Sequence, residues 1–349
     1  SSASTGAGET ALNVLATSKE RGNMNWRKVI APYQRPIFHK SMWQLINTVL
    51  PFVALWMLAY WSLSYSVWLT LLLDAAAAGF LVRIFILFHD CCHHSFFQSR
   101  KANEITGTVT GFLTSFSYLK WRNEHNLHHA GNGNLDERGA GDITTLTVEE
   151  YRALPRWRRF LYRMYRNPFV LFGLGPFYLV LVQSRLNRKG AGRKERMSTY
   201  LTNGSLIVFG ALLWWLLGWQ ALLLVHGPIL YLAAMAGIWL FYVQHQFEDT
   251  YFEESDDWNY ETAALKGSSF YRMPKPLQWI TGNIGYHHIH HLSPKIPNYR
   301  LPEAHEQHPA FQAVPTFGVI GSLRSLKFRL WDTQNKKMVG FNEVSAPPK

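Results

Sequence analysis

The chain has 349 residues, of which 48% are hydrophobic and 15% aromatic, and its formal net charge is +12. The apolar residues form blocks long enough to cross a bilayer, which excludes an ordinary two-domain soluble protein. No zinc-finger spacing, RNA-binding signature or basic helix accompanies the charge, so no nucleic-acid partner is expected. Attraction to an anionic membrane surface or an acidic protein partner explains the charge better. The only cysteines, Cys91 and Cys92, are neighbours, which excludes a disulfide framework.

The N-terminal part of the chain predicts a tail followed by a membrane hairpin. Residues 1–25 are small, polar and mixed in charge, so we expect a mobile tail, with one domain over residues 26–349. Residues 26–42 are basic and aromatic, which is typical of a membrane–water interface. Two apolar runs follow at about 43–63 and 67–88, and each is long enough to span.

The second apolar run contains two ionisable residues. Arg83 lies near its end, so we expect this side chain to snorkel to the interface. Asp74 lies deeper, where it would support a helix contact or line a cavity. The alanines from Ala75 to Ala78 favour close packing of a neighbouring helix.

The central and C-terminal parts complete the predicted fold. Residues 89–200 are polar and basic, with weaker apolar patches at 105–119 and 168–183 that predict interfacial or re-entrant helices. A second apolar block is too long for one crossing, so we expect spans at about 205–222 and 226–246. The pattern predicts an all-α integral membrane protein with four transmembrane helices in two hairpins, interfacial helices, and a cytoplasmic helical cap.

Basic residues indicate which side of the membrane each segment faces. Six Lys and Arg residues precede residue 43, seventeen lie in 89–200 and eleven follow residue 247. The short links between the predicted spans have none. By the positive-inside rule, both termini and the central segment face the cytoplasm.

Three histidine clusters fall on that same predicted side. A helix places residues three and four apart on one face, so each cluster can direct its imidazoles at one point. Their neighbours His94 and His288 fall off that face, and we expect them to be surface or supporting residues. A further histidine, His245, lies at the end of the last predicted span. The nine candidate metal ligands are His89, His93, His125, His128, His129, His245, His287, His290 and His291.

The number and kind of these donors predict the metals. The eight imidazoles of the three clusters exceed the three or four ligands that one ion takes, so two ions are expected. Plentiful neutral nitrogens favour two iron ions over hydrolytic zinc, with O₂ as co-substrate. Ligating imidazoles usually donate their other N–H to a carboxylate or carbonyl. The acids expected to accept in this way are Asp90, Glu124, Asp142, Glu248 and Asp249.

Two other classes of membrane protein would place their ligands differently. A metal transporter or storage protein places polar ligands inside its spans near the midplane. Here the clusters lie at the ends of the predicted spans, and only Asp74 is deep. A bis-histidine haem protein needs paired histidines on facing spans, and the sequence lacks that pattern.

The three clusters resemble the histidine boxes of membrane fatty acid desaturases. The similar segments are His89–His93 (HDCCH), Trp121–His129 (WRNEHNLHH) and His287–Leu292 (HHIHHL), within a resemblance over roughly residues 40–305. The three residues inside the first box, and the later segment Ile296–Tyr299, resemble the acyl-lipid Δ12/ω-6 type.

The chain departs from the family pattern at two positions. Cys92 stands where many relatives have glycine or another small residue. Phe241, four residues before His245, stands where animal Δ9 relatives have an asparagine near the metals. This second departure affects the outer coordination of the metals.

The resemblance implies an O₂-dependent diiron oxidoreductase that inserts a cis double bond into a lipid acyl chain. Its substrate would be a membrane lipid or acyl chain in a tunnel between the spans. Its electron donor would be ferredoxin or a cytochrome b5-like protein. We expect a multi-pass protein of a bacterial inner membrane with a cytoplasmic metal site. A hydroxylase or carotenoid ketolase on the same scaffold is the alternative, because these enzymes return oxygen to the carbon.

Overall fold

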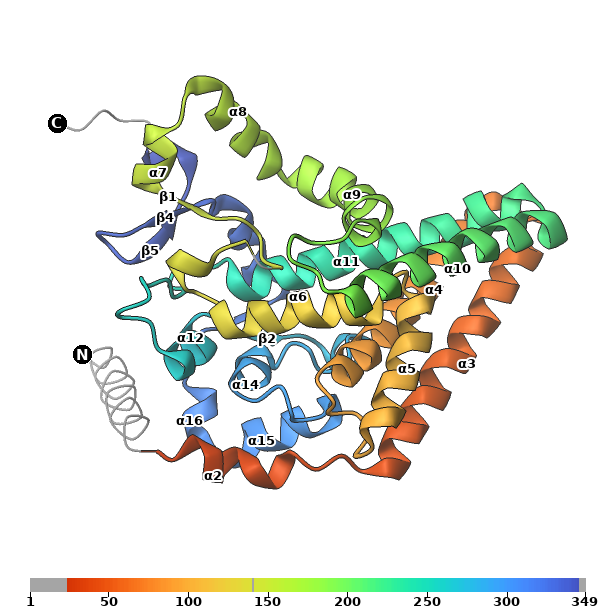
Figure 1. Cartoon of the computed structure of the whole chain (residues 1–349), viewed down its shortest axis with the longest axis horizontal. Helices are drawn as coiled ribbons and strands as arrows, with labels where there is room; N and C mark the ends of the chain where they lie inside the picture. The colour runs from red at the N-terminus through yellow and green to blue at the C-terminus, as the bar shows by residue number, and fades with distance from the viewer. Residues whose placement is uncertain (1–23, 140, 345–349) are drawn as a thin grey trace, which may run out of the picture.

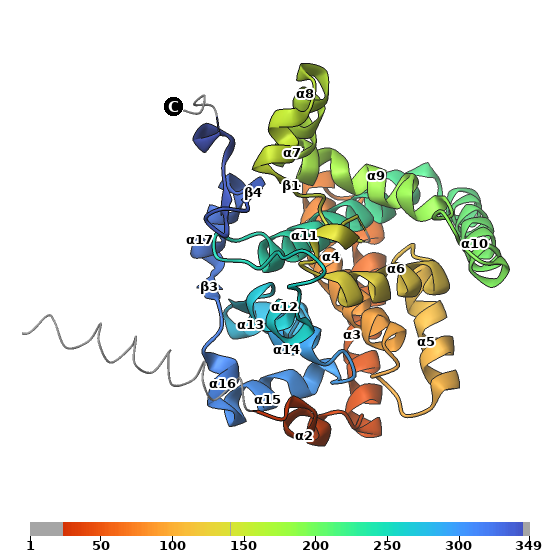
Figure 2. The same ribbon diagram turned by 60° about the vertical axis from the view of Figure 1, so that its left-hand side comes forward.

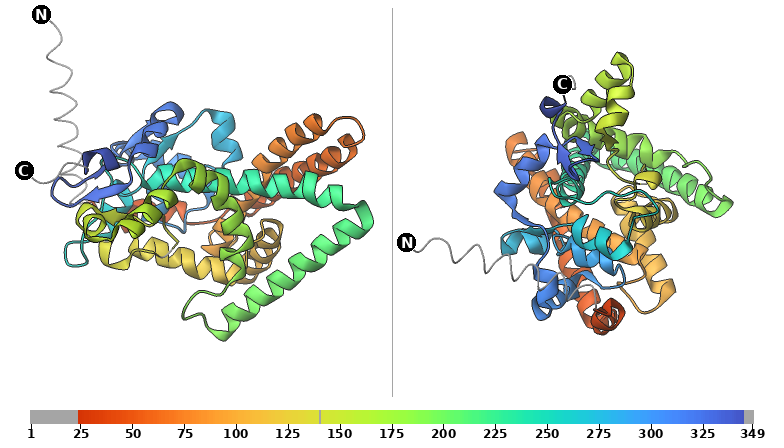
Figure 3. Two further views of the ribbon diagram at one scale, coloured as in Figure 1. Left: turned by 90° about the horizontal axis from the view of Figure 1, so that it is seen from above. Right: turned by 90° about the vertical axis from the view of Figure 1, so that its left-hand side faces the viewer.

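A computed structural model describes residues 24–139 and 141–344, so the predicted tail lies almost wholly outside the described residues. Two helical hairpins project from one side of the molecule, and the other segments gather around their opposite ends (Figures 1 and 3). The hairpins confirm the predicted architecture. The four long helices are α3 (Phe38–Ser62), α4 (Val67–Cys92), α10 (Arg193–Leu217) and α11 (Gly227–His245).

The second hairpin differs from its predicted bounds. Among the described residues four helices are long and apolar enough to span, and the fourth covers Ala221–His245 because a wide helical turn precedes α11. The third begins at Arg193, twelve residues before the predicted start, since its basic first turns stay helical. It ends at Leu217 because Gly218 has φ 91°, a conformation that glycine adopts without strain. The chain therefore turns earlier than the hydropathy pattern predicts.

Small and hydroxylated side chains hold α3 against α4. Ala59 and Ala77 are fully buried between the helices. The hydroxyls of Ser62 and Thr70 lie 2.7 Å apart. Asp74 lies four residues after Thr70 on the same helical face and is also fully buried, which agrees with its predicted place at a helix contact.

Arg83 does not snorkel, which corrects the prediction. Its side chain is 2% exposed, and Nε donates to Oγ1 of Thr48 at 2.9 Å. The guanidinium lies 3.8 Å from the ring centroid of Trp279 and donates to the Trp279 carbonyl. These acceptors and the ring compensate for lost hydration. Arg83 thereby joins α4 to α3 and to α13 (Lys275–Ile280).

Shorter helices surround the ends of the spans. The pair Arg156–Tyr165 and Phe169–Arg185 is apolar enough to span only when taken together, and it is bent by 60°. This bend agrees with the re-entrant alternative predicted for 168–183. The other short helices are α2 (Trp26–Ile30), α5 (Arg100–Leu113), α6 (Tyr118–Gly131), α7 (Val148–Ala153), α8 (Arg156–Tyr165), α9 (Gly175–Leu181), α12 (Tyr260–Lys266), α14 (His287–Leu292), α15 (Leu301–Gln307), α16 (Pro309–Gln312) and α17 (Val319–Ser322).

Two small sheets, which the sequence did not predict, tie the C-terminal segment to the cap. β1 (Leu146–Thr147) pairs in parallel with β4 (Leu330–Asp332), and β4 pairs antiparallel with β5 (Lys337–Val339) (Figure 2). β2 (Phe270–Arg272) pairs in parallel with β3 (Thr316–Gly318). Strands of two or three residues are too short to show a period-two pattern.

Candidate metal centre

Five buried imidazoles form a first group at the ends of α4, α6 and α14. Nε2 of His125 lies 2.9 Å from Nε2 of His89 and 2.9 Å from Nε2 of His129. Nε2 of His290 lies 3.1 Å from Nε2 of His129. The ring of His93, just after α4, lies 4.7 Å from the rings of both His89 and His129. One ligand atom from each of the five residues falls within 4.8 Å of the others.

Four further imidazoles form a second group. His128, His245 and His291 each offer a nitrogen within 4.8 Å of the other two. Nε2 of His287 joins them at 2.9 Å from Nε2 of His245 and 3.0 Å from Nε2 of His291. All nine candidate ligands named from the sequence therefore lie in one of the two groups. His245, at the end of α11, lies beside histidines of α14.

The spacing and chemistry of these nitrogens fit two metal ions. Two nitrogens bound at right angles through bonds of about 2.1 Å stand about 3 Å apart, as these pairs do. Burial, followed by repulsion from neighbouring imidazoles, holds the pKa of His125, His128 and His290 well below its usual value, so these ligands are neutral. Nε2 of His93 and of His128 is buried without a hydrogen-bond partner among the described residues, and a bound ion would satisfy both.

The two groups of imidazoles are in direct contact. The ring of His129, from the first group, stacks on the ring of His291, from the second, with centroids 4.2 Å apart and planes 18° apart. His125 and His128, on consecutive parts of α6, also belong to different groups. One helix therefore supplies donors to both groups and holds them side by side.

Neighbouring side chains and carbonyls orient the imidazoles. Nδ1 of His245 lies 2.9 Å from the carbonyl oxygen of Gly267, so an N–H there leaves Nε2 free for a metal. Trp121 stacks on His125 with centroids 4.3 Å apart. No motif in the sequence pointed to Gly267.

Asp90 supports the first group through the backbone that follows the third box. Its Oδ1 lies 3.6 Å from Nδ1 of His89, longer than a hydrogen bond. Its Oδ2 accepts from the backbone N–H and the side-chain amide of Asn298, both at 2.8 Å. The Asn298 amide also exchanges hydrogen bonds with Gln44 at 2.7 and 2.8 Å. The Ile296–Tyr299 segment is part of the family resemblance, but no pattern in the sequence predicts this contact.

The other acids expected behind imidazoles lie elsewhere. Glu124 pairs with Lys120 at 2.7 Å, and Asp142 accepts a backbone N–H of its own loop at 2.8 Å. Glu248 and Asp249 are exposed. Glu124 and Asp142 nevertheless line the cavity described below together with imidazoles of both groups.

His94 and His288 stay outside both groups, as their position off the predicted face implies. His94 is half-buried and adopts φ 54° where α4 ends. His288 is fully buried, with Nε2 3.2 Å from Nδ1 of His305. Burial lowers the pKa of His288 to about 3. His288 is therefore a supporting residue of the core, and only His94 lies near the surface.

A cavity of about 780 Å³ reaches both groups of imidazoles. Its walls come from α4, α6, α9 and α11, and its volume suits a drug-sized or lipid-sized ligand. His89, His125 and His287 line one part, and apolar residues such as Leu230 and Ala233 line another. An apolar channel that passes both groups can hold a hydrocarbon chain beside bound metals.

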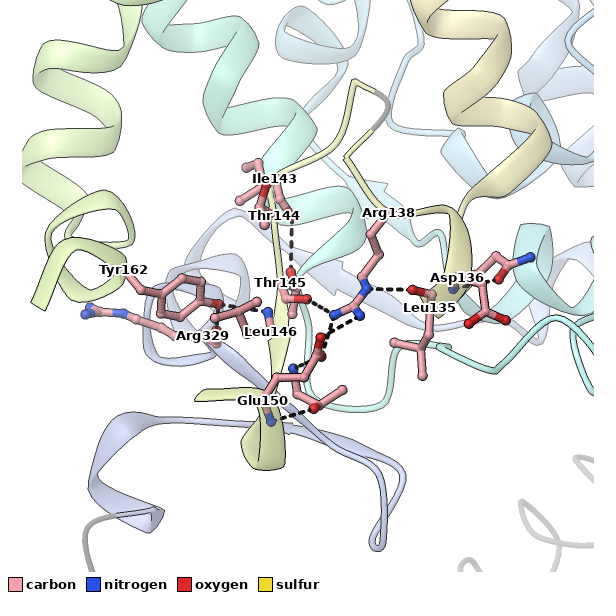
Figure 4. A network of polar contacts seen from close by, with 12 residues as sticks. Leu135, Asp136, Arg138, Ile143, Thr144, Thr145, Leu146, Glu150, Tyr162 and Arg329 are labelled. Atoms are coloured by element: carbon pink, nitrogen blue, oxygen red, sulfur yellow. Dashed lines mark hydrogen bonds and ion pairs between the residues drawn. The ribbon is translucent and has the colours of Figure 1, made fainter. Parts of the chain in front are cut away.

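An arginine clamp fixes the loop that forms one cavity wall, residues 141–144 (Figure 4). Nη1 and Nη2 of Arg138 each bind one carboxylate oxygen of Glu150, at 2.8 and 2.9 Å. Nε of Arg138 donates to the Leu135 carbonyl and Nη1 to the Thr145 carbonyl, both at 2.8 Å. The two ends of the loop are thereby held to one side chain.

Several known proteins have sequences similar to this chain. The family model described as fatty acid desaturase matches residues 66–317. A fatty acid desaturase of Bacillus subtilis (strain 168) is 54% identical over 321 residues, 92% of this chain and 91% of the relative. A chloroplastic omega-6 fatty acid desaturase of Arabidopsis thaliana is 25% identical, covering 81% of this chain and 63% of the plant protein. An sn-1 oleoyl-lipid 12-desaturase of Synechocystis is 27% identical over 64% of each chain.

The family match covers most of the chain, and it contains all three histidine boxes, α4 and the second hairpin. The relative from Bacillus subtilis is similar over almost its full length. The chain belongs to the fatty acid desaturase family and is an O₂-dependent oxidoreductase of the membrane.

Proposed function

We propose that nine histidines hold two iron ions, which desaturate an acyl chain lying in the 780 Å³ cavity. The observation that carries this proposal is the meeting of both imidazole groups with one apolar cavity. Iron bound by these nitrogens would supply O₂ activation and the removal of hydrogen from the chain. Overall, the acyl chain loses two hydrogens. These, together with two electrons and two protons from outside, reduce one O₂ to two waters.

The protein's own part is to bind and orient the acyl chain and to exclude water. The apolar walls from α4, α9 and α11 hold a hydrocarbon chain without competing polar groups. Neutral imidazoles keep their lone pairs for the metals near neutral pH, because burial opposes their protonation. The hydrogen bond between Nδ1 of His245 and the Gly267 carbonyl leaves Nε2 of His245 to face the other imidazoles of the second group.

We propose a Δ12/ω-6 position for the new double bond and a membrane glycerolipid as the acyl carrier. The support is the spacing of the first box and the similarity to relatives named omega-6 and oleoyl-lipid 12-desaturases. We also propose a bacterial inner membrane location with the termini and metal site in the cytoplasm. This agrees with the side on which the basic residues lie. Ferredoxin or a cytochrome b5-like protein is the proposed electron donor.

Expression in a host that makes oleoyl lipids tests the function. Gas chromatography with mass spectrometry should show a new diene whose second double bond is at carbon 12. His290→Ala should abolish it, while His39→Ala, a change at an exposed histidine of α3, should not. A double bond at another carbon would contradict the Δ12 proposal alone. A hydroxylated product would favour the hydroxylase alternative, and no product with a working donor would contradict the function.

A further inference from the structure

Basic side chains gather where α4 ends, next to the first group of imidazoles. Nζ of Lys295 donates to the backbone carbonyl of His93 at 3.0 Å. The guanidinium of Arg122 lies 5.9 Å from the ring centroid of Tyr118, whose hydroxyl donates to the Cys91 carbonyl at 3.3 Å. Both cations therefore contact the last turn of α4, which carries His89 and ends just before His93.

A third cation, Arg100, begins α5 seven residues after His93, and we call Arg100, Arg122 and Lys295 the basic patch. Arg100 and Lys295 are exposed and Arg122 is half-buried. Lys295 binds the backbone of His93, and Arg122 packs on the ring of Tyr118, which is bonded to Cys91, so both cations lie at the end of α4. The patch thus borders the end of α4, next to a member of the first group.

Few acids offset this charge. Glu104 pairs with Arg100 at 3.0 Å, whereas neither Arg122 nor Lys295 forms an ion pair within the described part of the chain. Asp90, beneath the patch, is buried and accepts hydrogen bonds from Asn298. Two unpaired cations at a surface attract an acidic partner and raise its association rate.

We propose that the basic patch is the docking surface for an acidic electron-carrier protein, and that electrons enter through the first group. The inference rests on the proposed function, which consumes two electrons for each double bond. Each docking delivers one electron from a reduced carrier. Two such electrons, with two protons and the two hydrogens taken from the acyl chain, reduce one O₂ to two waters. The carbonyl that Lys295 binds belongs to His93 itself, so the patch is in direct contact with a member of the first group.

Charge reversal at the patch tests the docking surface. Arg122→Glu with Lys295→Glu is compared with Lys189→Glu with Lys194→Glu, a matched change at two exposed lysines beside the start of α10. The iron-loaded proteins in nanodiscs are mixed with reduced ferredoxin, and reduction of the metal site is followed by stopped-flow absorbance. The patch variant should be reduced about tenfold more slowly at low salt and lose its salt dependence. The matched control should behave as the unchanged protein does.

Three controls make the test decisive. Reduction by dithionite and iron content should be the same in all proteins, and the milder Arg122→Gln with Lys295→Gln should show a smaller effect in the same direction. Equal ferredoxin rates in patch and control variants would overturn the proposal. So would an equal loss with dithionite, or a defect confined to binding of anionic phosphatidylglycerol vesicles. Because metal reduction is measured without product, a missing diene in the unchanged protein would count against the proposed function instead.

Discussion

Phe241 packs against His128, with ring centroids 4.9 Å apart, and the same ring lies 5.2 Å from His245. Phe241 lines the 780 Å³ cavity and also a small cavity of about 20 Å³ beside these two histidines. A phenyl ring offers no lone pair, so this position supplies no donor to the second group. Its role is to separate the 780 Å³ cavity from the small cavity and its polar walls.

Removing this ring should uncouple O₂ consumption from desaturation. Phe241→Ala would join the two cavities and admit water to the second group. We expect the ratio of double bonds formed to O₂ consumed to fall about tenfold, and stability to fall by about 3 kcal/mol. An oxygen electrode, a peroxide assay and product analysis measure this ratio. Phe241→Leu, which keeps an apolar barrier, is the control, and an unchanged ratio in the alanine variant would refute the role.

Each group of imidazoles should hold its own iron ion. His128→Ala removes one of four nitrogens from the second group and leaves the five of the first intact. We expect iron content to fall from about two to about one ion per chain and activity to be lost. Elemental analysis of purified protein checks this, with His39→Ala as the exposed-histidine control. Retention of both ions would mean that His128 is not a ligand.

The metal-free protein should lose stability in mild acid. Burial holds the pKa of His125, His128 and His290 well below 6.5, whereas the unfolded chain titrates near 6.5. Below pH 6.5 the unfolded state therefore binds more protons, and folding stability falls until the folded pKa is reached. The slope is at most about 1.4 kcal/mol per pH unit for each histidine.

Thermal unfolding in detergent at pH 7, 6 and 5 measures this effect. The metal-free protein should lose stability from pH 7 to pH 5, and the metal-free His128→Ala variant, which lacks one of these imidazoles, should lose less. Equal loss in the two proteins would show that titration elsewhere is responsible.

The arginine clamp predicts a further loss of stability at lower pH. Hydrogen bonds from Arg138 lower the pKa of Glu150 to about 2. A carboxyl with a depressed folded pKa contributes stability above its unfolded pKa of about 4.5, and this is lost as pH falls toward 2. Because the Glu150 side chain is 42% exposed, solvent screening limits the contribution to about 1 kcal/mol.

Glu150→Gln measures the clamp, with the exposed neighbour Glu149→Gln as control. The Glu150 variant should unfold about 1 kcal/mol more easily at pH 7, and the difference should shrink below pH 4.5. A difference that stays constant down to pH 3 would mean that the carboxylate charge does not matter.

Local patterns predicted the site better than its surroundings. The i, i+3 and i+4 spacing located the imidazoles because helical neighbours are set within one turn. The contact between Asp90 and Asn298 joins residues 208 apart in sequence, and no local pattern specifies it. The same holds for Arg83, whose burial depends on Trp279. The helix α10 begins before the third apolar block, because hydropathy does not register polar helical turns such as those after Arg193.

The origin of the nine imidazoles on α4, α6, α11 and α14 has a consequence for how the protein matures. Neither group is complete until the chain has been synthesised as far as residue 291. Metal loading is therefore a late step, after both hairpins have entered the bilayer. Each ion then closes long loops between segments, as a cross-link would, so a cell starved of iron would accumulate a loosened protein exposed to proteolysis.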